Sequence, residues 1–128
     1  MAISIVRLGS TRRRDEGLRL GTVRRPPRGV PKARFASEDW YDVWLPALSP
    51  SAALMARTSF DEAGKWWPVF ARRFRAELKK AEASRLLDVL AALSHQTNFS
   101  VGCYCEDEHQ CHRSLLRREL SDRGAIVN

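Results

Sequence analysis

The hydrophobic residues follow a strand period in four short segments of the chain. Residues 3–8, 18–23 and 99–105 are apolar or alternate between apolar and polar positions, and residues 125–127 begin a fourth such run. In the segment 99–105, Phe99, Val101, Cys103 and Cys105 fall on one side. The four segments predict four β-strands.

A helical period dominates the rest of the chain. Trp67, Phe70, Phe74 and Leu78 recur at a spacing that places them on one face, which predicts a helix over residues 66–80. The other predicted helices cover residues 37–45, 50–55, a segment that starts at Ser59, 84–93 and 111–123. The expected order of the main elements is β-β-ααα-β-α-β. It predicts one α/β domain over residues 1–128, with three layers and a mostly parallel sheet flanked by helices.

The composition is typical of a soluble protein, with 44% hydrophobic and 29% charged residues. No apolar run approaches the roughly 20 residues that span a bilayer, and the N-terminal residues lack the apolar stretch of a secretory signal. All three cysteines lie in residues 103–111, which is a poor disulfide framework and favours free thiols in a reducing compartment. We therefore expect a cytoplasmic protein without membrane contact.

The net charge of +7 is concentrated near the N-terminus. Residues 1–35 contain ten Lys and Arg residues against two acidic residues, so this third carries +8 and the remainder carries −1. Residues 24–31 combine three arginines with three prolines and a glycine, which predicts a stiff basic loop. Such a region attracts polyanions or a small anionic ligand, and a solvated loop with no partner is the alternative.

The segment 103–113 concentrates the reactive side chains. It holds every cysteine and two of the three histidines, between a predicted strand and a predicted helix. Ligands of α/β proteins bind at such strand-to-helix connections. Cys111 lies at the predicted helix start, where the helix dipole favours a thiolate, and His112 and Arg113 follow it.

Four interpretations of this segment stay open. A zinc site would use its thiols and imidazoles, but the spacing CxCx3HxCH matches no common zinc module, so we expect no metal and no other cofactor. Cys111 is a candidate reactive thiol. Arg113 and the helix start are candidates for non-covalent anion binding. In a purely structural role, Cys103 and Cys105 would be small residues of a buried strand.

The same residues resemble a bacterial family known as domain of unknown function 488, including its YeaO-like members. The resemblance begins with a strand ending at Gly102-Cys103, an acidic turn over residues 106–110, and Cys111-His112-Arg113 opening a helix. Three further elements match in order: residues 16–29, Trp40 with Pro50-Ser51, and Phe70 and Phe74 with Glu77-Leu78.

The resemblance implies a compact three-layer α/β fold. It also implies a pocket at which six residues gather: Arg19, Arg24, Arg28, Cys111, His112 and Arg113. Two positions depart from the family pattern. Val23 stands where the family has Asp, which removes a potential acid or base, and Pro26 stands where it has Trp, which removes a pocket wall.

Two functional hypotheses follow. The first is an enzyme or sensor for a small phosphorylated or carboxylated molecule, in which Cys111 and His112 are catalytic. Its anion-binding residues would be Arg113, Arg19, Arg24 and Arg28. The alternative is a non-enzymatic protein that binds nucleic acid weakly through the basic, loop-rich N-terminal third, about residues 1–36. An enzyme needs these arginines to converge in a cleft, whereas a nucleic-acid binder needs them spread over a surface.

Overall fold

The computed structural model describes residues 1–128 and contains one four-stranded sheet. Its strands are β1 (Ile3–Arg7), β2 (Leu18–Gly21), β3 (Val43–Trp44) and β4 (Phe99–Cys103). All neighbours are parallel, in the order β1-β4-β2-β3. The register pairs Phe99 with both Ile3 and Leu18, so β4 lies at the centre and its carboxyl end is flanked by the ends of β1 and β2.

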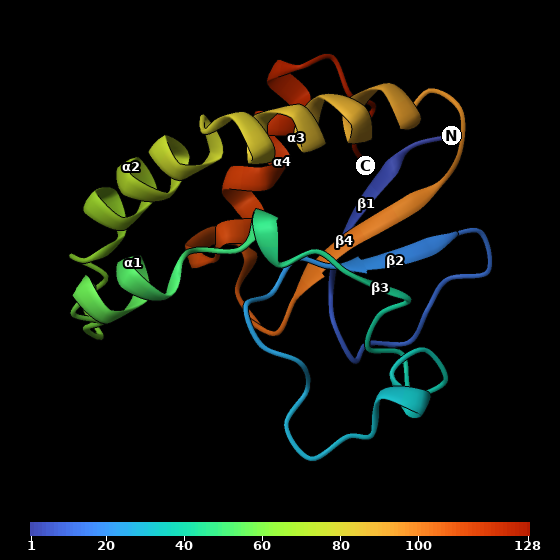
Figure 1. The fold of residues 1–128 in the computed structure, drawn as a ribbon, viewed down its shortest axis with the longest axis horizontal. Coiled ribbons are helices and arrows are strands. Elements are labelled where there is room, and N and C mark those ends of the chain that lie inside the picture. The colour runs from blue at the N-terminus through green and yellow to red at the C-terminus, as the bar shows by residue number, and fades with distance from the viewer.

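Four α-helices complete the α/β domain: α1 (Ala52–Arg57), α2 (Trp67–Leu78), α3 (Ala81–Leu93) and α4 (His112–Asp122). Short 3-10 helices occur at η1 (Lys32–Arg34), η2 (Pro46–Leu48) and η3 (Glu108–Gln110). Figure 1 shows the α-helices grouped to one side of the sheet, with the loop after β2 extending away from them. No helix has the length and apolar character needed to cross a membrane. The predicted α/β class with a parallel sheet is confirmed.

The main core lies between the helices and one face of the sheet. Ile3 and Val101 of the sheet and Phe74, Leu87 and Leu116 of the helices belong to it and are fully buried. Burying an aliphatic or aromatic side chain of this size stabilises a fold by about 1.5–3 kcal/mol. The helical spacing predicted for α2 therefore produces the face that the core requires.

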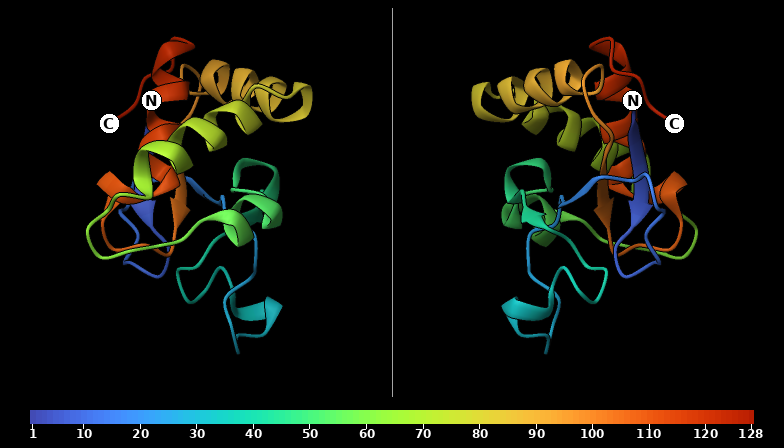
Figure 2. Two further views of the ribbon diagram at one scale, coloured as in Figure 1. Left: turned by 90° about the vertical axis from the view of Figure 1, so that its left-hand side faces the viewer. Right: turned by 90° about the vertical axis from the view of Figure 1, so that its right-hand side faces the viewer.

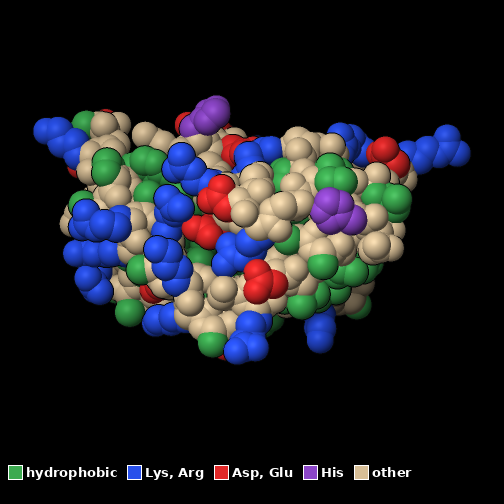
Figure 3. Space-filling view, turned by 90° about the horizontal axis from the view of Figure 1, so that it is seen from above, with side chains coloured by type: hydrophobic (Ala, Val, Ile, Leu, Met, Phe, Trp, Pro, Cys, Tyr) green, Lys and Arg blue, Asp and Glu red, His purple; other side chains and the backbone are tan.

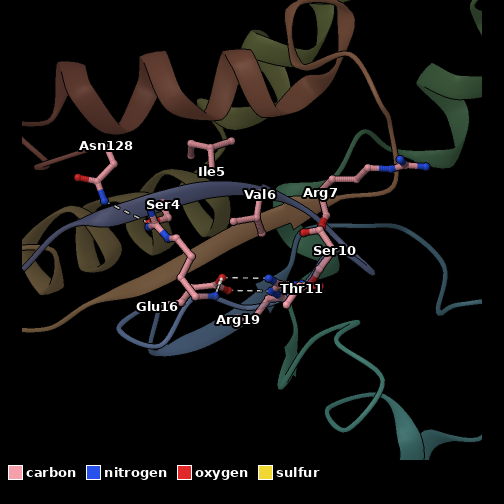
Figure 4. A pocket seen from close by; sticks show the side chains of 10 residues that line it. Ser4, Ile5, Val6, Arg7, Ser10, Thr11, Glu16, Arg19 and Asn128 are labelled. Atoms are coloured by element: carbon pink, nitrogen blue, oxygen red, sulfur yellow. Dashed lines mark hydrogen bonds and ion pairs between the residues drawn. The ribbon is translucent and has the colours of Figure 1, made fainter.

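The opposite face of the sheet has a polar region beside the segment 8–17, and its carboxyl end is covered by Leu8 and Tyr41. Ser4, Arg19 and Ser100 lie side by side on it in the strand register. Glu16 reaches this face from the loop and accepts hydrogen bonds from Arg19 and from Ser100 Oγ, the latter at 2.7 Å. The third layer of the domain is therefore a loop (Figures 2 and 4).

The prediction of a helix over residues 37–45 is wrong, because part of this segment forms the edge strand β3. Asp39 adopts a left-handed backbone, with φ of 62°, which interrupts a right-handed helix. Asp42 then holds the chain beside β2: its carboxylate accepts from the Arg19 backbone N–H at 2.8 Å, and its own N–H donates to the Arg19 carbonyl at 2.7 Å.

Three smaller expectations also differ. The segment from Ser59 to Lys65 forms turns rather than a helix, and β4 ends at Cys103 instead of reaching Cys105. The final predicted strand is reduced to one bridge between Val127 and Ile3. The other helices form near their predicted positions. Ser51 caps α1 by accepting from the Leu54 N–H at 3.0 Å.

Candidate functional site

The candidate site lies at the carboxyl end of β4, where a short turn leads into α4. Cys103 ends the strand, and Cys111 is the residue immediately before the helix. Asp107 stabilises the intervening turn by accepting from the His109 backbone N–H at 2.9 Å. Because β2 runs parallel to β4, the residues that follow β2 lie beside this turn.

The three cysteines form a cluster of free thiols. The Sγ atom of Cys103 lies 3.4 Å from that of Cys111 and 3.6 Å from that of Cys105. Cys103 and Cys111 are buried, whereas Cys105 is exposed. The expectation that Cys105 is part of a buried strand is therefore wrong, because the chain has already left the sheet at that position.

The imidazole of His112 is held between this cluster and β2. Its Nε2 atom lies 2.6 Å from the Thr22 carbonyl oxygen, and its Nδ1 atom lies 3.8 Å from Cys111 Sγ. A carbonyl oxygen can only accept a hydrogen bond, so Nε2 carries the proton of the neutral ring. The lone pair of Nδ1 then faces the thiol of Cys111, where it can accept the thiol proton.

The environment of the cluster separates the acidities of the thiols. A hydrogen bond from Cys103 is the largest influence that lowers the pKa of Cys105, and Arg113 lowers it further by its charge. The hydrogen bond between Cys111 and Cys103 also lowers the pKa of Cys111, and His112 contributes in the same direction. The pKa of Cys103 is raised, chiefly by its hydrogen bonds to the other two thiols. Cys103 is therefore the thiol of the cluster that holds its proton most firmly.

A cavity of about 560 Å³ opens beside the cluster. Its walls come from the loop after β2, the start of α1, the turns before α2, and the segment 103–112. They are mostly apolar, with aromatic side chains from Phe60, Trp66, Phe70 and Tyr104. Arg24 and Arg25 supply the positive charges of the lining. Arg24 is oriented by its Nε, which donates to the Pro50 carbonyl at 3.2 Å.

The structure brings Cys111, His112 and Arg24 to this cavity, but it separates the other predicted arginines from it. Arg28 is exposed in the loop and does not line the cavity. Arg19 is fully buried on the far face of the sheet, where its guanidinium bonds to Glu16 and to two backbone carbonyls (Figure 4). Arg113 is 3% exposed and lies behind the cluster, donating from Nη2 to the Cys105 carbonyl at 2.6 Å.

Several lining residues were not identified from the sequence. Arg25 and Tyr104 lie inside segments that the sequence marks as basic or reactive, and the Tyr104 hydroxyl donates to the Arg25 carbonyl at 2.8 Å. Phe60 and Trp66 belong to the turns before α2, and their ring centroids lie 4.7 Å apart. Their spacing carries no signal, because the turn conformation that folds them over the cavity has no periodic pattern.

Several basic residues of the N-terminal third are bonded to acidic side chains. In the N-terminal third, Arg7, Arg12 and Arg34 are paired with acidic partners. Figure 3 shows Lys and Arg side chains on the helical face as well, with acidic side chains among them. Arg72, Lys79 and Arg118 line a second groove, between α2 and α4. The N-terminal concentration of charge is thus partly neutralised in the fold.

Residues 3–124 match a family model described as DUF488-N3a, the active DUF488-N3 subclade. The match covers nearly the whole chain, so this protein belongs to the DUF488 family. It confirms the resemblance identified from the motifs around Cys111. No curated protein and no solved structure matches the chain.

Proposed function

We propose that this DUF488 protein is a thiol-dependent enzyme or sensor for a small anionic molecule that enters the cavity. Cys111 provides the reactive thiol, His112 its base, and Arg24 the positive charge that attracts the ligand. The observation that carries the proposal is the 3.8 Å approach of His112 Nδ1 to Cys111 Sγ, in the wall of a cavity that Arg24 also lines.

The chemistry begins with transfer of the thiol proton from Cys111 to His112 Nδ1. The imidazolium that forms keeps its other N–H on the Thr22 carbonyl, which fixes the ring while the thiolate reacts. The position of Cys111 before the first turn of α4 further favours the thiolate, through the positive end of the helix dipole. His112 thus acts through two ring nitrogens that already lie near their partners, Nδ1 near Cys111 Sγ and Nε2 near the Thr22 carbonyl.

The cavity favours a ligand that combines an anionic group with an apolar or ring-shaped part. Aromatic side chains form much of its surface, and the arginines lie at the loop after β2. Val23 also lines it, at the position where the family pattern has Asp. An apolar residue there leaves no carboxylate to repel an anion. Pro26, the second departure, is exposed and does not line the cavity.

The proposal is tested by comparing two alkylating reagents of similar size, anionic iodoacetate and neutral iodoacetamide. Modification of Cys111 is followed by mass spectrometry. We expect replacing Arg24 and Arg25 by Ala to slow the iodoacetate reaction by about tenfold, with little change for iodoacetamide. The matched control replaces Arg72 and Lys79 by Ala, which removes the same amount of charge. Both side chains are exposed, Arg72 within α2 and Lys79 immediately after it. An anion site at Cys111 would be ruled out if the Arg24 and Arg25 replacement slowed both reagents equally. It would also be ruled out if the control replacement slowed the iodoacetate reaction as much as the Arg24 and Arg25 replacement does.

A second candidate function is weak nucleic-acid binding. It is supported by the exposed side chains of Arg24, Arg25, Arg28 and Lys32, which follow one another along a single loop. The free thiols fit a reducing compartment such as the bacterial cytoplasm, where either function would operate.

A further inference from the structure

We propose that Cys103, Cys111 and His112, together with Cys105, bind one Zn²⁺ ion. The proposed metal state uses the same Cys111 and His112 as the proposed function and excludes the thiol reaction while the ion is bound, but the proposal does not rest on any reaction at Cys111. It starts from the ligand atoms themselves: the two buried Sγ atoms and one His112 ring nitrogen all lie within 4.8 Å of one another. Two thiolates and an imidazole are the ligand types that Zn²⁺ prefers.

The spacing of these atoms is close to that of a tetrahedral zinc site. With Zn–S bonds of about 2.3 Å and Zn–N bonds of about 2.0 Å, neighbouring ligand atoms lie about 3.5–3.8 Å apart. The cluster shows 3.4 Å between Cys103 and Cys111, 3.6 Å between Cys103 and Cys105, and 3.8 Å from Cys111 to His112 Nδ1. Cys103, Cys111 and His112 therefore have the spacing of three zinc ligands, and Cys105, next to Cys103, is the proposed fourth ligand.

The surroundings of His112 provide a second, independent observation. A histidine that binds zinc usually donates its other ring N–H to a carbonyl or carboxylate, which fixes the tautomer. His112 has this arrangement already, because Nε2 donates to the Thr22 carbonyl at 2.6 Å and leaves Nδ1 free towards the thiols. Phe74 packs edge-on against the ring, with a centroid distance of 5.6 Å, and limits its movement.

The charge near the cluster also suits a thiolate-rich site. One Zn²⁺ with three thiolates carries a net charge of −1, which is costly to bury without compensation. Arg113 is buried, and it lies two residues after Cys111 in the first turn of α4. Its Nη2 donates to the Cys105 carbonyl, while its Nε has no hydrogen-bond partner. Arg113 therefore supplies a buried positive charge next to the proposed ligands.

The spacing of the proposed ligands along the chain does not match a common zinc module, which is why the sequence alone did not predict this site. Common zinc modules pair their ligands as CxxC or HxxxH within one turn. Here Cys103 ends a strand and Cys111 precedes a helix, and the turn between them folds back so that the two meet. His109, the other histidine of the segment, is outside the cluster.

The experiment uses full-length protein treated with a chelator and then titrated with Zn²⁺ or with Co²⁺ as a spectroscopic probe. We expect one ion per chain and, with Co²⁺, the near-ultraviolet absorption of thiolate ligation. Cys105→Ser should keep about two-thirds of that absorption, since two of three thiolates remain. Replacing both Cys103 and Cys111 by Ser should weaken Zn²⁺ binding by more than about 100-fold, which exceeds the effect of removing a supporting residue alone.

The control is His109→Gln, which should retain full affinity because His109 is outside the cluster. Binding that survives the double cysteine replacement, or a Co²⁺ spectrum of the wild-type protein without thiolate absorption, would overturn the proposal. If the double variant fails to fold, the Co²⁺ spectrum of the wild-type protein still shows whether thiolates bind the ion. The iodoacetate comparison is made in chelator-treated protein, so the anion site and the zinc site succeed or fail separately. Zn²⁺ should slow alkylation of Cys111, since the bound ion occupies that thiol.

Discussion

Arg19 and Glu16 form a buried ion pair with two hydrogen bonds, at 2.7 Å from Nε and 2.9 Å from Nη2 of the arginine. Their side chains are 0% and 2% exposed. The pair joins β2 to the loop that covers the polar face of the sheet. Since the guanidinium is already bonded to Glu16 and to carbonyls of Ser10 and Asp39, Arg19 acts in the fold rather than at the cavity.

Replacing Glu16 by Gln should destabilise the protein strongly. The amide retains the shape of the carboxylate but leaves the charge of Arg19 buried without a counterion, which costs about 3–5 kcal/mol. Urea unfolding followed by circular dichroism measures the change. Glu62→Gln is the matched control, because Glu62 is exposed. A decrease below about 1 kcal/mol at Glu16 would mean that water compensates the arginine.

The contribution of this pair should depend on pH. Burial alone would raise the pKa of Glu16, but hydrogen bonds from Arg19 and Ser100 outweigh burial and lower the pKa below its ordinary value of 4.5. A depressed folded-state pKa stabilises the protein above pH 4.5, and this stability is lost as the pH falls through the folded-state value. The difference in melting temperature between wild type and Glu16→Gln should therefore shrink below pH 4.5. A difference that stays constant down to about pH 2 would mean that the ionisation of Glu16 is not linked to folding.

Elements with a regular period could be predicted from the sequence, whereas elements defined by pairing could not. The spacing of Phe70, Phe74 and Leu78 predicted α2, because a helix repeats its buried positions regularly. The segment around Val43 misled the prediction, because two-residue β3 is defined by pairing with β2 and has no period of its own. Likewise, the motif at Cys111 marked the residues that form the thiol cluster, whereas the burial of Arg19 depends on a covering loop that no local pattern reveals.

Among the thiols, Cys105 should react first with neutral iodoacetamide in metal-free protein. Cys111 is the candidate reactive thiol of the sequence analysis, but it is 2% exposed, whereas Cys105 is exposed. Access to the reagent therefore favours Cys105. Residue-resolved mass spectrometry after brief labelling measures the order, with the urea-unfolded protein as the control in which all three thiols are accessible. Faster labelling of Cys103 than of Cys105 in the folded state would mean that the turn after β4 opens readily.

Binding to duplex DNA should be weak and should fall steeply with salt, because it uses a few exposed arginines. Replacing Arg24, Arg25 and Arg28 by Ala should reduce the slope of log affinity against log salt by about one unit for each phosphate group that the protein no longer neutralises. Replacing Arg12 should change it less, because Arg12 is held by Asp42 at 2.6 Å.

Fluorescence anisotropy with a short labelled duplex measures these slopes. The control variant removes Arg72, Lys79 and Arg118 from the groove between α2 and α4. If only the loop variant fails to bind, the loop is the surface that meets DNA. If only the control fails to bind, the helical groove is that surface. Undetectable binding at low salt eliminates the nucleic-acid hypothesis and leaves the loop arginines to the cavity, where Arg24 and Arg25 already line the wall beside Cys111.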